Sequence, residues 1–283
     1  MFVDTGKLPV ALVLLLVVFG GVVATAAPQA ELWPRWEAHN PASTTVVDHS
    51  DWGAFLRRYV VTDTTDGVNR LRYGAVTPAD RRALQGYIAA LAGTEVSRLA
   101  RPEQLAYWTN LYNAVTVELI LDHYPLNSIR DIGISGPVYN RHPWDAPLVT
   151  VEGEELTLND IEHRIMRPIW QDPRIHYVVN CASIGCPNLL PVPFTAGNWD
   201  TLASEAARSY VNHPRGVNLS GRRPVFSSIY DWYAADFGGD IAGVVEHALQ
   251  YARPALAEEL RHFARGGHRG RVSYEYDWNL NGD

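Results

Sequence analysis

A long helix bounded by two prolines is the feature that most restricts how this chain can fold. The run from Arg101 to Tyr124 has Pro102 near its start and is followed directly by Pro125, positions where proline opens and ends helices. Large apolar side chains recur along it at three- and four-residue spacing: Leu105, Trp108, Tyr112, Val115 and Leu119. This is the spacing of a stripe that faces a core, so we expect the helix to pack inside a globular domain.

Two amides, Asn110 and Asn113, lie on an adjacent face of the same helix. Amides in a mostly apolar helix need hydrogen-bond partners if they are buried. Two interpretations stay open: the amides fix neighbouring backbone, or they belong to a functional site.

The remaining pattern predicts short helices and short strands around the long helix. Helices are expected at 48–59, 78–92, 161–167, 198–211, 241–251 and 254–264, and strands at 68–76, 148–151, 155–158, 175–179 and 271–276. No internal repeat or low-complexity linker divides the chain. The predicted fold class is therefore α+β, a mainly helical single domain over residues 28–283 with a small mixed or antiparallel sheet.

The N-terminus has the pattern of a signal peptide. Lys7 precedes an apolar run from Leu8 to Val23, and Ala24-Thr25-Ala26 supplies small residues where a signal peptidase reads. We expect residues 1–27 to be removed, leaving about 256 residues that are exported to the periplasm or the extracellular space. An uncleaved anchor is the alternative, because the run is near the lower length limit for a spanning helix. No later segment approaches that length.

The charge of the chain restricts the classes of partner that it can bind. The formal net charge is -7 and no extended Lys/Arg cluster is present, which argues against nucleic acid. The sequence predicts no cofactor. It leaves open whether the partner is a small molecule, a peptide or an envelope substrate.

Both cysteines of the chain lie in one stretch, from Asp172 to Pro187. A predicted strand, 175–179, leads into a loop of small residues that begins at Cys181 and ends at Cys186. Loops that follow a strand often present functional side chains. The sequence therefore predicts a site at this loop.

Four stretches together resemble the family known as domain of unknown function 547. They are 106–114, 158–167 with Glu162-His163, 176–187 with Asn-Cys-Ala-Ser-Ile-Gly-Cys-Pro, and 230–237 together with the closing 276–281. The resemblance spans about residues 100–281 and rests on the order and spacing of these stretches. It implies no particular reaction. Similar plant domains carry serine at the position of Cys186, so the resemblance implies neither an obligatory disulfide nor an obligatory thiol there.

Cysteine and histidine together predict a thiol-dependent hydrolase or acyl transferase. Such a site needs a nucleophilic sulfur, an imidazole that handles the proton and a group that orients the imidazole. Cys186 or Cys181 would be the nucleophile and His163 the base, with Glu162 or Asn110 as the orienting group. The alternative base is His176. We expect Cys186 to matter more than Cys181. Gly185 allows close backbone approach just before Cys186, and Pro187 fixes the chain just after it, a geometry that suits the presentation of one side chain. Cys181 is expected to be more buried.

Other interpretations compete with this one. In an exported protein, Cys181 and Cys186 would usually form a disulfide, here as the staple of a non-catalytic binding protein of the cell envelope. A zinc site that uses both cysteines with His163 and His176 is a further possibility. A thiol–disulfide oxidoreductase is the least favoured, because Cys-x-x-Cys is absent.

Overall fold

The structure is a computed structural model that describes residues 27–133, 142–267 and 272–282. The predicted signal peptide lies outside the described residues. Within these ranges, no helix has the length and apolar character needed to cross a bilayer.

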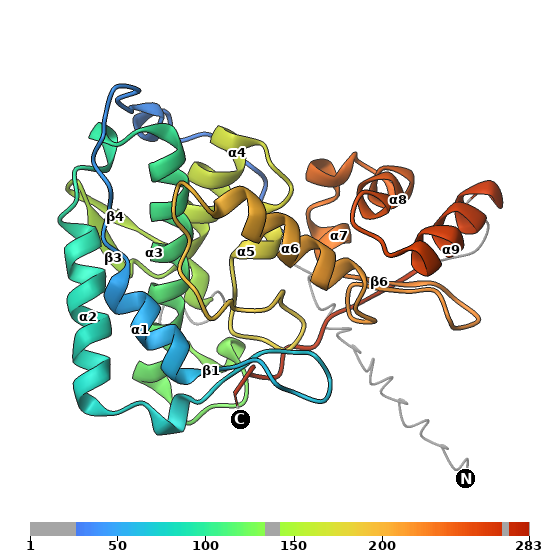
Figure 1. The fold of residues 1–283 in the computed structure, drawn as a ribbon, viewed down its shortest axis with the longest axis horizontal. Coiled ribbons are helices and arrows are strands. Elements are labelled where there is room, and N and C mark those ends of the chain that lie inside the picture. The colour runs from blue at the N-terminus through green and yellow to red at the C-terminus, as the bar shows by residue number, and fades with distance from the viewer. Residues whose placement is uncertain (1–26, 134–141, 268–271, 283) are drawn as a thin grey trace, which may run out of the picture.

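The long helix α3, Arg101–His123, lies in the larger part of the molecule with α1, Ser50–Tyr59, and α2, Pro78–Ala92 (Figure 1). Every residue of α3 from Glu103 to Val117 is buried, so the polar positions are enclosed along with the apolar stripe. Thr77 caps α2, because its side chain accepts a hydrogen bond from the Asp80 N–H, and Pro78 occupies the first turn. These helices confirm the predictions made for residues 78–92 and 101–124.

A second apolar cluster builds the narrower part of the molecule, where α8 and α9 project away from α1–α3 (Figure 1). Its main elements are α6, Trp199–Val211, α8, Ile241–Leu249, α9, Pro254–Arg265, and the strands β5, Val217–Asn218, β6, Val225–Ser227, and β7, Ser273–Glu275. β6 pairs antiparallel with β5 and parallel with β7, so this sheet is mixed.

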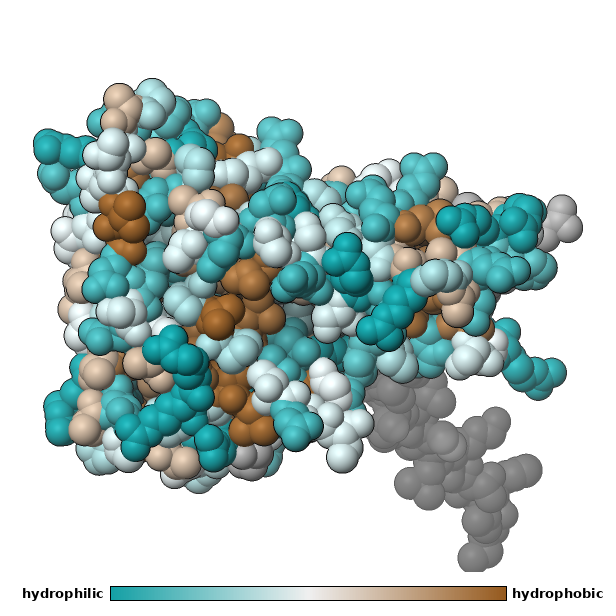
Figure 2. Space-filling model, in the orientation of Figure 1, coloured by the Kyte–Doolittle hydropathy of each residue, from teal (hydrophilic) through white to brown (hydrophobic). Residues whose placement is uncertain are grey.

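Two further sheets are short antiparallel pairs. β1, Val60–Val61, pairs with β2, Arg70–Leu71, and β3, Val149–Val151, pairs with β4, Glu154–Leu156. The fold is thus a mainly helical α+β domain with small sheets, as predicted. Hydrophobic residues on the face shown in Figure 2 gather in small groups within a largely hydrophilic surface.

Two predicted strands are wrong. The expected strand 175–179 is the helical turn α5, Ile175–Val178, which begins where the Ile175 N–H donates to the Asp172 carbonyl. A short apolar run of this kind fits a buried helix as well as a strand, and its neighbours decide between them. The expected strand 68–76 is reduced to β2, and a 3₁₀ turn, Tyr73–Ala75, follows it.

The helix that was expected to end before Pro168 continues through it. A π-helical segment, η6, Asp160–Met166, runs directly into α4, Arg167–Trp170. Pro168 has no N–H to donate to the preceding turn. The N-terminal segment makes up for this loss, because the N–H groups of Glu31 and Trp33 donate to the carbonyls of His163 (2.9 Å) and Arg164 (3.0 Å).

Candidate functional site

Amide side chains hold the loop that carries the cysteines. Asn113 on α3 donates to the Val178 carbonyl and accepts from the Asn180 N–H, both at 2.8 Å. Asn180 in turn donates to the Pro187 carbonyl at 2.7 Å, which ties the start of the loop to its end. Asn113 is thus a buried support for the cysteine loop.

The C-terminal segment lies along this loop. The Gly185 N–H donates to the Asp277 carbonyl at 2.8 Å. A Cβ on Gly185 would lie 2.8 Å from the Asp277 nitrogen and 2.9 Å from the Tyr276 ring, so the approach requires glycine. The expected role of Gly185 in close backbone approach is confirmed, and the result is that Tyr276 reaches the sulfurs.

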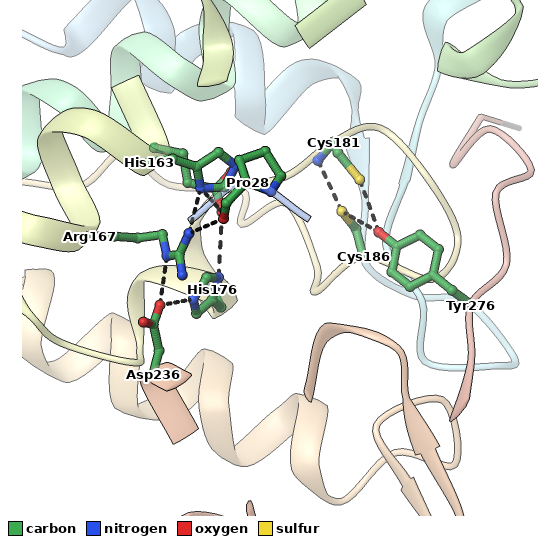
Figure 3. Close-up of polar contacts among 9 residues, drawn as sticks. Pro28, His163, Arg167, His176, Cys181, Cys186, Asp236 and Tyr276 are labelled. Carbon is green, nitrogen blue, oxygen red and sulfur yellow. Dashed lines mark hydrogen bonds and ion pairs between the residues drawn. The ribbon is translucent and has the colours of Figure 1, made fainter. Parts of the chain in front are cut away.

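The two cysteines are free thiols joined through Tyr276, an arrangement called the thiol pair below (Figure 3). The Cys186 sulfur accepts from the Cys181 N–H at 3.0 Å and from the Tyr276 hydroxyl at 3.1 Å. The Cys181 sulfur lies 3.0 Å from the hydroxyls of both Ser183 and Tyr276. The predicted alternative of a Cys181–Cys186 disulfide is therefore not what the structure contains.

The two thiols differ in acidity. Burial disfavours the charge on Cys186, but hydrogen bonds from the Cys181 thiol, the Tyr276 hydroxyl and the Cys181 N–H outweigh it and lower the pKa of Cys186 to about 7. Burial and the neighbouring Cys186 raise the pKa of Cys181 well above its usual value. The geometry thus favours a thiolate on Cys186.

The expectation that Cys181 is the more buried cysteine is wrong. Cys186 is 4% exposed, whereas Cys181 is half-buried. The chain turns sharply after Cys181, because Ala182 adopts a left-handed conformation with φ of 61°. The turn brings the Cys186 sulfur back onto the Cys181 N–H.

A second group of ionisable side chains is called the histidine cluster below. Its members come from η6, α4, α5 and the 3₁₀ turn Ala234–Phe237, and they are Glu162, His163, Arg167, His176 and Asp236. In Figure 3, this cluster and the thiol pair form two separate sets of contacts.

Asp236 joins the members of this cluster. Its Oδ2 accepts from Arg167 Nε at 2.6 Å and lies 2.7 Å from His176 Nε2. Arg167 also donates through Nη1 to His163 Nδ1 at 3.0 Å. On the other side of His176, Nδ1 lies 3.4 Å from a Glu162 oxygen, but the angles do not make a hydrogen bond.

The cluster holds its carboxylates ionised. Burial raises the pKa of Glu162, but His163, His176 and Arg167 lower it more strongly, to about 2. Hydrogen bonds from His176 and Arg167 likewise overcome burial and depress the pKa of Asp236. Burial lowers the pKa of His163 to about 4, which leaves its imidazole neutral at pH 7.

The structure does not form the expected cysteine–histidine pair. Among the described residues, no hydrogen bond joins either sulfur to His163 or His176. Tyr233 packs against the histidine cluster, because its ring stacks on the ring of His176 with the centroids 4.3 Å apart.

The other expected members of the site have different surroundings. Asn110 donates to the Phe194 carbonyl at 2.7 Å and accepts from the Phe194 N–H at 3.0 Å, the contacts of an amide that fixes backbone. In the described part of the chain, no group of three His, Cys, Asp or Glu side chains is placed to hold a metal ion, so the zinc hypothesis gains no support.

Arg167, Asp236 and Tyr276 are the members of these groups that the sequence did not single out as site residues. Tyr276 begins the last stretch of the family resemblance, which was the available signal for it. Asp236 lies in stretch 230–237 of the same resemblance, but its contacts with Arg167 and His176 could not be predicted, because these partners are far away in the sequence.

Residues 96–211 match the family described as "Protein of unknown function, DUF547". The matched region contains α3, η6 and the cysteine loop. This region of the chain is therefore a member of that family, as the sequence motifs predicted. Comparison with curated proteins gave no match, and neither did comparison with solved structures.

Proposed function

We propose that this protein is a thiol-dependent hydrolase or acyl transferase that uses Cys186 as its nucleophile. The observation that supports the proposal best is the Cys186 sulfur, which accepts hydrogen bonds from the Cys181 N–H and the Tyr276 hydroxyl. These donors stabilise the thiolate, which is the reactive form of cysteine. We also propose export, on the basis of the Ala24-Thr25-Ala26 pattern after the apolar N-terminal run.

The proposed reaction proceeds through a thioester. The Cys186 thiolate forms a bond to the acyl carbon, the bond from that carbon to the leaving group breaks, and the leaving group takes a proton from the Tyr276 hydroxyl. Water then adds to the thioester, returns a proton to Tyr276 and releases the carboxylic acid and the thiolate. In a transferase, an alcohol or amine takes the place of water.

A preformed thiolate removes the need for the expected histidine base. A general base activates a nucleophile that is protonated at working pH, but a thiol with a pKa of about 7 is already partly ionised. His163 is also occupied at Nδ1 by Arg167. The histidine cluster is accordingly proposed to stabilise the region around Tyr233 rather than to transfer the proton.

A dithiol redox protein is the second candidate. It is favoured by one observation, the direct interaction of two free thiols whose pKa values are shifted in opposite directions. In that reaction Cys181 and Cys186 would lose two electrons and two protons to a disulfide substrate, which would be reduced to two thiols.

An acylation experiment tests the first proposal. Native protein treated with p-nitrophenyl acetate near pH 7 should gain one acetyl group on Cys186, located by peptide mass spectrometry, and should lose it again on standing as water hydrolyses the thioester. Pretreatment with iodoacetamide is the control and should block acetylation. Acetylation that is absent, or that survives the pretreatment, would contradict the nucleophile. Oxidation of both cysteines by a disulfide reagent, without any acetylation, would favour the dithiol protein.

A further inference from the structure

A cavity of about 390 Å³ lies beside the histidine cluster, between the N-terminal segment and η6. The residues that line it come from the N-terminal segment, from the segment between β4 and η6, from η6 itself and from the turn that contains Asp145. They are Pro28, Gln29, Glu31, Asp145, Thr157, Asn159, Asp160, His163 and Arg164. Neither cysteine is among them. The cavity is therefore distinct from the thiol pair.

His163 places a hydrogen-bond donor at the wall of this cavity. The residue is 3% exposed, and its Nδ1 faces Arg167 Nη1 at 3.0 Å. A guanidinium can only donate, so Nδ1 accepts and the neutral imidazole carries its hydrogen on Nε2. Nε2 makes no hydrogen bond to any residue in the described ranges. His163 is thus a largely buried side chain in the cavity wall, and its Nε2 is a donor without a partner among the described residues.

Two carboxylates at the rim of the cavity, Glu31 and Asp145, have no cationic partner among the described residues. Arg164 is already paired with Asp160 at 2.9 Å. One oxygen of Asp145 accepts from Asn159 Nδ2 at 2.6 Å, and neither Asp145 nor Glu31 forms an ion pair within the described part of the chain. The cavity therefore combines excess negative charge with one unpaired donor on a residue of its wall.

The neighbouring side chains already bind a peptide carbonyl. Arg167 Nη1 donates to the Pro28 carbonyl at 2.9 Å, and the N–H groups of Glu31 and Trp33 bind the carbonyls of η6. The surface at this end of η6 is thus suited to binding a peptide backbone in an extended conformation.

We infer that this cavity binds the free amino terminus of a peptide or amino-acid amide, with the ammonium group at Glu31 and Asp145 and the adjacent carbonyl oxygen on His163 Nε2. The carboxylates of Glu31 and Asp145 neutralise the ammonium charge of the ligand, and the ligand carbonyl supplies the acceptor that His163 Nε2 lacks. This site does not depend on the thiol chemistry, so either proposal can fail without the other.

Calorimetric titration of the purified protein with L-alaninamide tests this inference. We expect saturable binding to one site, and binding of N-acetyl-L-alaninamide that is weaker by about tenfold or more, because acetylation removes the charged donor. Glu31→Gln and Asp145→Asn, both at exposed positions, should each weaken binding of L-alaninamide by about two- to fivefold. Glu155→Gln, an exposed carboxylate on β4 outside the cavity, is the matched control and should leave binding unchanged.

Three results would overturn the inference. They are no saturable heat with L-alaninamide, equal binding of the acetylated compound, and binding that the Glu31→Gln/Asp145→Asn double variant leaves intact. His163→Leu gives a further measurement, provided that its circular dichroism spectrum matches the parent. It should weaken L-alaninamide binding while the preference for a free amine remains.

Discussion

Cys186→Ser should remove the fast alkylation of the native protein by iodoacetamide, and Cys181→Ser should retain it. Roughly half of Cys186 is ionised at pH 7 if its pKa is about 7, whereas a thiol whose pKa lies above 9 is less than about 1% ionised. We expect the labelling rate to fall about a hundredfold in Cys186→Ser. The rate is followed by mass spectrometry of the intact protein and of its peptides.

Thermal melts of the same two variants provide the control. Both substitutions are small, so each variant should retain the parent melting temperature within a few degrees. Two outcomes would contradict the account. One is labelling confined to Cys181, the more exposed thiol. The other is no labelling before reductant is added, together with equal loss of melting temperature in both variants, which is the behaviour of a structural disulfide.

Arg167→Leu should lower the free energy of unfolding by about 3 kcal/mol, the largest stability effect that we expect from the histidine cluster. Arg167 is 5% exposed and binds Asp236, His163 and the Pro28 carbonyl. Its loss leaves the carboxylate of Asp236 with His176 as its remaining hydrogen-bond partner among the described residues. The Asp236 side chain is 22% exposed, so water solvates part of the unpaired carboxylate. The expected loss of stability is therefore at the low end of the range for a broken buried ion pair.

Urea unfolding followed by circular dichroism measures this change. Arg98→Leu is the matched control, because Arg98 is 75% exposed and forms a surface pair with Glu95. That variant should differ from the parent by less than about 1 kcal/mol. If Arg167→Leu were equally mild, Arg167 would not hold the cluster together.

Local signals in the sequence were sufficient for the long helices. Pro78 and Thr77 define the start of α2, and the spacing of apolar residues defines α3. They were insufficient for residues 175–179, where an apolar run fits both a strand and a buried turn. They were also insufficient at Pro168, because the donors that replace its missing N–H come from Glu31 and Trp33, far away in the sequence.

Local signals in the sequence were likewise sufficient for only part of the candidate site. Both cysteines and their tight loop could be recognised from their spacing, and Gly185 could be recognised as a point of close approach. The contact with Tyr276 could not, since it depends on the C-terminal segment lying along the loop. Spacing also gave no measure of burial, and the sequence therefore assigned Cys181 as the buried thiol when the turn at Ala182 makes Cys186 the buried one.

The central claim is that Cys186 is a stabilised thiolate, and the pH dependence of its alkylation tests this most directly. The rate of iodoacetamide labelling at Cys186 follows the thiolate fraction, so it should rise with pH to a plateau with a midpoint at about 7. The hydrogen bonds from Tyr276 and the Cys181 N–H are the physical reason. A midpoint at 9 or above would show that burial outweighs these donors, and it would contradict the account.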